Sequence, residues 1–128
     1  MTRVRFTFAM LAALTGFAMA PAAARADCDP GDCWGAVAYG PGGVWAYAVN
    51  HPTRAAAGQT AQGECGNTCT NVLTFHNSCG AYATGPRGNF YYGWGNASTR
   101  RQAESIALSQ CRARGSNCSV RVWSCTQR

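Results

Sequence analysis

Large and small side chains alternate along several short stretches of this chain. In the stretch Trp45 to Val49, the order Trp-Ala-Tyr-Ala-Val puts the large side chains on one face of a strand and the alanines on the other. Such a difference between faces is typical of an antiparallel sheet that a helix covers on one side. Farther along, Ala103, Ile106, Ala107 and Cys111 recur at helical spacing. The pattern therefore predicts an α+β fold.

The chain contains two copies of one pattern. Gly35 to Asn50 (GAVAYGPGGVWAYAVN) matches Gly80 to Gly95 (GAYATGPRGNFYYGWG) without a gap, and both read as a small-residue strand, a Gly-Pro-x-Gly turn and an aromatic strand. A helical stretch that ends in cysteine, and then a further strand, follow in each copy. We therefore expect two tandem ββαβ repeats, at about 34–79 and 80–125, with pseudo-twofold symmetry and an antiparallel sheet covered by helices.

The second repeat predicts a capped helix and a strand that returns from it. Thr99 is a good N-cap residue, and Gln102 three residues later completes a capping-box pattern. Strict alternation along 119–124 puts both valines on one face and, on the other, Arg121 and Trp123.

The first 26 residues have the order of a secretory signal peptide. Two arginines precede the apolar run 6–20, and the small-residue stretch 21–26 follows it. We expect cleavage after Ala26, with Ala20 as the alternative. The apolar run is shorter than the roughly twenty residues that span a bilayer, so a membrane anchor is disfavoured. Export then leaves a short N-terminal segment, 27–33, and a single globular domain, 34–128, that is secreted or periplasmic and has no integral membrane segment.

Eight cysteines remain in the mature chain, and an even, dense set in an exported protein is typical of disulfides. A zinc site is disfavoured because the spacings lack paired Cys-x-x-Cys knuckles. Eight cysteines allow 105 pairings, and the repeat narrows them, because equivalent cysteines should pair alike. The favoured set is Cys65–Cys69, Cys111–Cys118, Cys79–Cys125 as a link between the repeats, and Cys28–Cys33. A symmetric alternative joins Cys65 to Cys111 and Cys69 to Cys118.

The segments CWGAVAYGP, NSCGAYATGP and YYGWG, followed by a helix ending in cysteine, resemble a family of small secreted bacterial domains known as domain of unknown function 4189. The resemblance covers about Cys33 to Cys125. It implies secretion and a ββαβ-type repeat, and it brings no catalytic residues to this chain.

Charge is divided unevenly between the two halves. Residues 27–79 have a formal net charge of −3, whereas residues 80–128 have seven arginines against one acid and a net charge of +6. Such a basic half favours an anionic glycan or a protein as partner, and its arginines also fit a solvated surface. Nucleic acid is disfavoured. The candidate binding residues are Tyr91, as the exposed ring of the strand 90–94, and Arg100, Arg101, Arg112, Arg114 and Arg121.

The sequence offers few sets of residues that could act together in catalysis. His51 and His76 are the two histidines, both expected in loops, and together they would suit a nuclease-like hydrolase with one base and one acid. A cysteine nucleophile needs a free thiolate, and eight cysteines pair without remainder. Five acidic residues, three of them near the mature N-terminus, make a glycosidase pair improbable. No cofactor or metal is expected.

The sequence therefore favours a secreted, non-enzymatic interaction module for an envelope or host component. A secreted effector hydrolase that uses His51 and His76 is the alternative, and a purely structural envelope protein that associates with itself is a third hypothesis.

Overall fold

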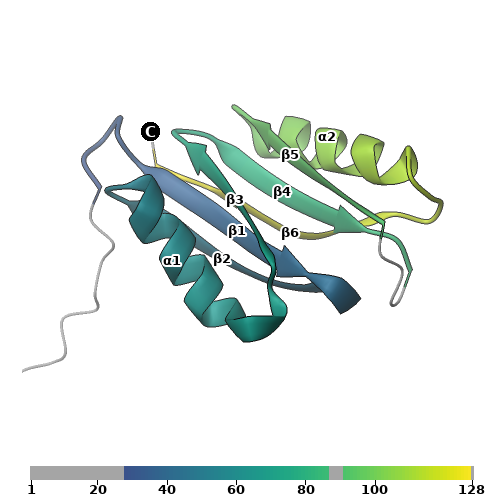
Figure 1. The fold of residues 1–128 in the computed structure, drawn as a ribbon. Helices are drawn as coiled ribbons and strands as arrows, with labels where there is room; N and C mark the ends of the chain where they lie inside the picture. Colours follow the sequence, from purple (N-terminus) through teal and green to yellow (C-terminus); the bar gives the residue numbers. More distant parts are fainter. Residues whose placement is uncertain (1–27, 87–90, 128) are drawn as a thin grey trace, which may run out of the picture.

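The computed structural model describes residues 28–86 and 91–127 (Figure 1). The predicted signal peptide, Phe90 and Arg128 lie outside these residues. The elements of the described residues, in chain order, are β1 (Trp34–Gly40), η1 (Pro41–Gly43), β2 (Val44–His51), α1 (Arg54–Cys65), η2 (Gly66–Thr68), β3 (Asn71–His76), β4 (Cys79–Thr84), β5 (Tyr92–Ala97), α2 (Arg100–Arg112) and β6 (Ser119–Cys125).

The element order confirms the predicted α+β fold with two ββαβ repeats. The strands form two three-stranded sheets, with the orders β2-β1-β3 and β5-β4-β6, so the first strand of each repeat lies at the centre of its own sheet. Neighbouring strands are antiparallel throughout both sheets.

The small faces of the strands lie against the helices. In the first repeat, Ala36, Ala38 and Ala48 pack on Ala57 and Ala61 of α1. The second repeat packs the corresponding small residues of β4 on α2. Both helices begin at a threonine cap, because Thr53 and Thr99 accept hydrogen bonds from the backbone N–H groups three residues later. Gln102 accepts a hydrogen bond from Ser98 Oγ at 3.2 Å, so the predicted capping box is only half formed.

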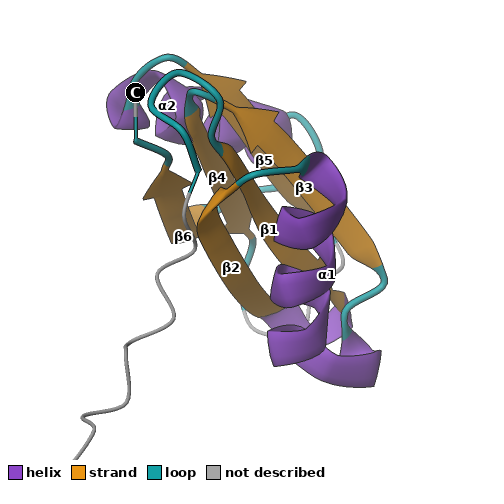
Figure 2. Ribbon diagram, turned by 90° about the vertical axis from the view of Figure 1, so that its left-hand side faces the viewer, coloured by secondary structure: helices purple, strands orange, loops and turns teal. Residues whose placement is uncertain are grey.

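The large faces of the strands meet between the two sheets. This buried cluster contains Val37, Tyr39, Phe75, Tyr82 and Val122, which come from both sheets. The molecule therefore has the layer order helix, sheet, sheet, helix, with α1 and α2 on opposite outer sides (Figure 2).

The two hairpins differ in length, and this corrects the ungapped repeat alignment. Ala36 pairs with Ala48 in the first sheet, whereas the equivalent Ala81 pairs with Gly95 in the second, two residues later than the alignment places it. Tyr47 therefore corresponds to Trp94 rather than to Tyr92. A shift of two residues keeps every side chain on the same face, which is why the alternating pattern did not reveal it.

A bulge in β6 makes the predicted alternation of 119–124 wrong. Tyr82 pairs with Val122, but the next residue of β4 pairs with Val120, so Arg121 is an extra residue in the ladder. Val120 packs on the α2 side and Val122 packs between the sheets. A bulge redirects its side chain, and here the redirected side chain is an arginine.

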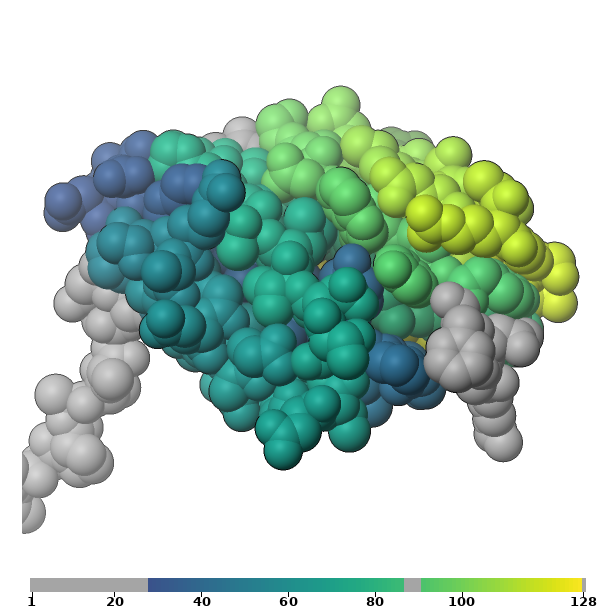
Figure 3. All heavy atoms as spheres, viewed as in Figure 1, coloured from purple at the N-terminus to yellow at the C-terminus, as the bar shows by residue number. Residues whose placement is uncertain are grey.

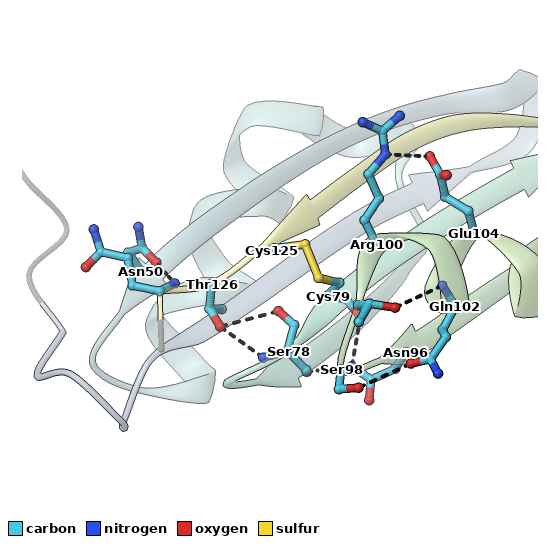
Figure 4. The surroundings of a disulfide bond; sticks show 12 residues. Asn50, Ser78, Cys79, Asn96, Ser98, Arg100, Gln102, Glu104, Cys125 and Thr126 are labelled. Carbon is cyan, nitrogen blue, oxygen red and sulfur yellow. Dashed lines mark hydrogen bonds and ion pairs between the residues drawn. A yellow bond between two sulfur atoms is a disulfide. The ribbon is translucent and has the colours of Figure 1, made fainter.

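The eight cysteines form four disulfides in the structure. Three of them close short loops, and the fourth, Cys79–Cys125, joins directly opposite residues of β4 and β6 (Figure 4). Cys79 begins β4, so this bond lies within the second sheet, and the expectation that it links the two repeats is wrong. Next to it, Ser78 and Thr126 exchange backbone and hydroxyl hydrogen bonds.

Candidate binding groove

An open groove of about 430 Å³ lies where the edge strands β2 and β6 run side by side. One wall is the face of β2 that carries its large side chains. This face points toward the second sheet, but part of it lies beyond the edge of that sheet. The other wall is β6. The lining residues are Trp45, Tyr47, Val49, Arg121, Val122, Trp123, Ser124 and Cys125.

Two aromatic side chains dominate the wall on β2. Trp45 is 43% exposed and Tyr47 is 46% exposed, although both belong to the face that is buried elsewhere in the molecule. They remain exposed because β2 is an edge strand, and the second sheet covers only part of its large face. Exposed aromatic side chains gathered in a concave surface are typical of interaction sites.

Arg121 and Ser124 supply the polar groups of the groove. The bulge directs Arg121 toward the space between the sheets, where its Nε donates a hydrogen bond to Thr84 Oγ1 at 3.1 Å. Ser124 is 5% exposed, and its Oγ finds no hydrogen-bond partner among the described residues. The groove therefore combines aromatic walls with one cation and one unpaired hydroxyl.

The other predicted binding residues lie outside this groove. Arg100 forms an ion pair with Glu104 at 3.1 Å, and its guanidinium lies 3.7 Å from the ring centroid of Trp123. Arg114 donates a hydrogen bond to the carbonyl of Tyr92. Exposed positions at or near the ends of α2 are occupied by Arg101 and Arg112.

Tyr91 was expected to be the exposed ring of its strand, and this is wrong. Its hydroxyl donates a hydrogen bond to the Ser116 carbonyl at 2.6 Å, and its ring covers Gly85 and Gly115. Tyr91 is therefore a half-buried packing residue. The exposed aromatic residue on β5 is Trp94, which belongs to the face that the alternating pattern assigned to the interior.

Both histidines lie at strand ends rather than in loops. Trp34 of β1 pairs with His51 on one side and with His76 on the other. The His76 ring stacks on the Trp34 indole with a centroid distance of 4.5 Å, and its Nε2 lies 2.8 Å from Asp32 Oδ1. On the same indole lies the guanidinium of Arg54, 4.8 Å from the ring centroid. The two histidines are thus separated by β1, which puts their backbones roughly 10 Å apart.

A second, smaller cavity of about 70 Å³ opens beside a cluster of tyrosines between the sheets. Tyr39 stacks on Tyr82 with a centroid distance of 4.6 Å, and Tyr92 lies beside both rings. Burial, followed by the neighbouring Tyr92, raises the pKa of Tyr39 to about 12, and burial also raises the pKa of Tyr82. These hydroxyls stay protonated at neutral pH.

The part of the chain that the structure describes holds no group of three or more histidine, cysteine or acidic side chains arranged to bind a metal ion. Within the same residues, no helix combines the length and the hydropathy that crossing a bilayer requires.

Sequence reasoning missed Trp45 and Tyr47 as surface residues. The alternation around them correctly marked a small face under a helix and a large face opposite. How far the second sheet covers that large face depends on the docking of the two sheets, which leaves no local signal in the chain.

Residues 34–125 match the family described as Domain of unknown function (DUF4189). Protein Rv1269c of Mycobacterium tuberculosis is 45% identical over 56 residues, which cover 44% of this chain and 45% of that protein. Protein Rv1813c of the same species is 38% identical over 77 residues, which cover 60% of this chain and 52% of that protein. The matches thus span about half the length of these relatives. The NMR structure of Rv1813c is similar to this chain, with a TM-score of 0.59, 28% identity, and coverage of 98% of this chain and 94% of that one.

Proposed function

The chain belongs to the family described as Domain of unknown function (DUF4189), and we propose that it acts as a secreted, non-enzymatic interaction module that binds an envelope or host component. Its four disulfides indicate an oxidising environment outside the cytoplasm. Export through the signal peptide 1–26 is part of the proposal.

One observation carries the proposed binding role: the groove between β2 and β6 exposes Trp45 and Tyr47 beside an arginine. Folding alone does not require large aromatic rings at an exposed edge, because smaller polar residues there would avoid the cost of apolar exposure. A partner that covers the rings would recover that free energy.

An NMR titration of the oxidised protein tests this function. The probes are peptidoglycan fragments, a sulfated polyanion, short RNA and an extract of envelope proteins. We expect at least one probe to shift the backbone signals of β2 and β6 together. If no probe perturbs these strands, or if shifts map only to α2, the groove is not the interaction surface.

A hydrolase is the second candidate, and the pair of His76 and Asp32 favours it. A carboxylate that accepts a hydrogen bond from a histidine fixes its tautomer, as in many catalytic dyads. Cleavage of RNA by the purified protein, abolished by His76→Ala and by His51→Ala, would establish this activity. An inactive parent protein, or variants that cleave as well as the parent, would remove it.

A further inference from the structure

Trp45 and Tyr47 form a linear aromatic platform along β2. Being two residues apart, they lie on the same face of the strand at a spacing of about 6.8 Å, and both rings are roughly half exposed. Aromatic faces stack on flat apolar surfaces. Pyranose rings with equatorial hydroxyl groups present such a surface through their axial C–H bonds, so consecutive sugars of a linear chain suit this platform.

The charge of the groove selects for an anion. Arg121 lines it, whereas none of the lining residues is acidic. Thr84 accepts a hydrogen bond from Arg121 Nε, and no described residue accepts one from the two terminal nitrogens. A guanidinium held in this way can bind a carboxylate through charge-assisted hydrogen bonds.

The floor of the groove contains an unpaired hydroxyl. Ser124 Oγ is buried and has no partner among the described residues. A buried hydroxyl without a hydrogen bond is unfavourable. This oxygen has almost no accessible surface, so a ligand in the groove contacts the rings and Arg121 rather than this hydroxyl.

From the two exposed rings and the guanidinium of Arg121 we infer that the groove binds a carboxylate-bearing oligosaccharide with equatorially linked sugars. The inference rests on the proposed interaction function and names its ligand class. A nucleic acid or a highly sulfated chain would call for several cations. Arg121 is the one cation among the lining residues, and Arg100, which stacks on the lining Trp123, is already paired with Glu104. A peptide added to the free edge of β2 or β6 would rely on backbone hydrogen bonds along that edge rather than on two rings and a guanidinium.

Calorimetry with two matched probes tests the inference. The probes are a hexamer of β-1,4-linked glucuronic acid and cellohexaose, which share the linkage and ring geometry but differ in the carboxylates. At low salt we expect the uronate to bind roughly tenfold more tightly, as expected for a charge-assisted contact. Rising salt should remove most of this difference.

Two pairs of variants locate the contacts. Arg121→Gln should reduce uronate affinity to that of cellohexaose and leave cellohexaose unchanged, whereas the exposed Arg112→Gln should change neither. Trp45→Ala should weaken both hexamers roughly tenfold. Trp94→Ala is the matched aromatic control, because Trp94 is 38% exposed on β5, which is not part of the groove, and it should change neither affinity.

Three results would overturn the inference: equal affinity for the two hexamers, a preference for uronate that survives Arg121→Gln, or no binding of either hexamer. If another probe still shifts the signals of β2 and β6 in the titration above, the proposed interaction function stands and only the ligand class is wrong. A failure of both experiments rejects both.

Discussion

At one end of each sheet, equivalent positions of the two repeats are occupied by different side chains that make different kinds of contact. By strand register, the disulfide Cys79–Cys125 of the second sheet corresponds to the stacked pair Trp34 and His76 of the first. Both join the central strand to its neighbour at the same place. The first repeat therefore holds this end by an aromatic stack and a histidine–aspartate contact, and the second holds it by a covalent bond.

Because of the tyrosines between the sheets, the free energy of unfolding varies with pH in the alkaline range. In the folded state the pKa of Tyr39 is raised from 10 to about 12, and burial is the largest cause. Between these pH values the unfolded chain loses the Tyr39 proton while the folded chain keeps it, so the free energy of unfolding falls as pH rises. We expect Tyr39→Phe to reduce this fall by up to about 2 kcal/mol in urea unfolding.

Tyr47→Phe is the matched control, because Tyr47 is exposed and lies outside the buried cluster. It should show the same alkaline loss of stability as the parent protein. Identical pH profiles for the parent and Tyr39→Phe would mean that Tyr39 ionises equally in both states.

At the scale of elements, the two helices approach their sheets by different means. Gly93 and Gly95 of β5 face α2, and a Cβ at Gly95 would overlap the carbonyl oxygen of Ala103. Alanines occupy the matching positions in the first repeat, Ala46 and Ala48. Contact between α2 and β5 therefore depends on glycine, whereas α1 rests on alanine side chains.

This difference predicts opposite outcomes for two identical substitutions. Gly95→Ala should lower the free energy of unfolding by about 2 kcal/mol or more, because the backbone of α2 must move. Gly63→Ala in α1 should raise it by up to about 1 kcal/mol, because nothing lies within 4 Å of the added Cβ and alanine favours the helix. Chemical denaturation measures both values. A neutral Gly95→Ala would show that α2 does not pack as described.

Element type and order were predictable because each stretch has a clear period of its own. The bulge at Arg121 was not, since the sequence around it alternates as an unbroken strand would. Nor was the longer second hairpin, because a two-residue shift preserves the faces. The groove depends on both the bulge and the docking of the sheets. The sequence therefore indicated Arg121 as a candidate only through its charge, and it gave no indication that Trp45 and Tyr47 line the same groove.

Across the molecule as a whole, the two repeats differ in net charge and in the length of their disulfide loops. In Figure 3, most of the first repeat lies toward the left of the visible face and most of the second toward the upper right. The longest disulfide loop runs from Cys79 through the basic residues 80–125, since Cys79 and Cys125 are 46 residues apart, against 4 to 7 for the other pairs. On the chain-entropy model, a longer loop gives greater stabilisation.

Removing single disulfides should therefore have unequal effects. The double variant Cys79→Ala/Cys125→Ala should lose about 4 kcal/mol of unfolding free energy, and Cys28→Ala/Cys33→Ala about 2 kcal/mol. Urea unfolding of the purified variants measures both losses. Equal losses would show that loop length does not govern the stability of this scaffold.

The groove as binding surface is tested most directly by the indole N–H signals of the four tryptophans, recorded by NMR while the oxidised protein is titrated with the glucuronic acid hexamer. The Trp45 signal should move progressively to saturation, while the Trp94 signal, from a similarly exposed side chain on β5, should stay in place. A stationary Trp45 signal in the presence of bound hexamer, or equal movement of both signals, would contradict binding in the groove.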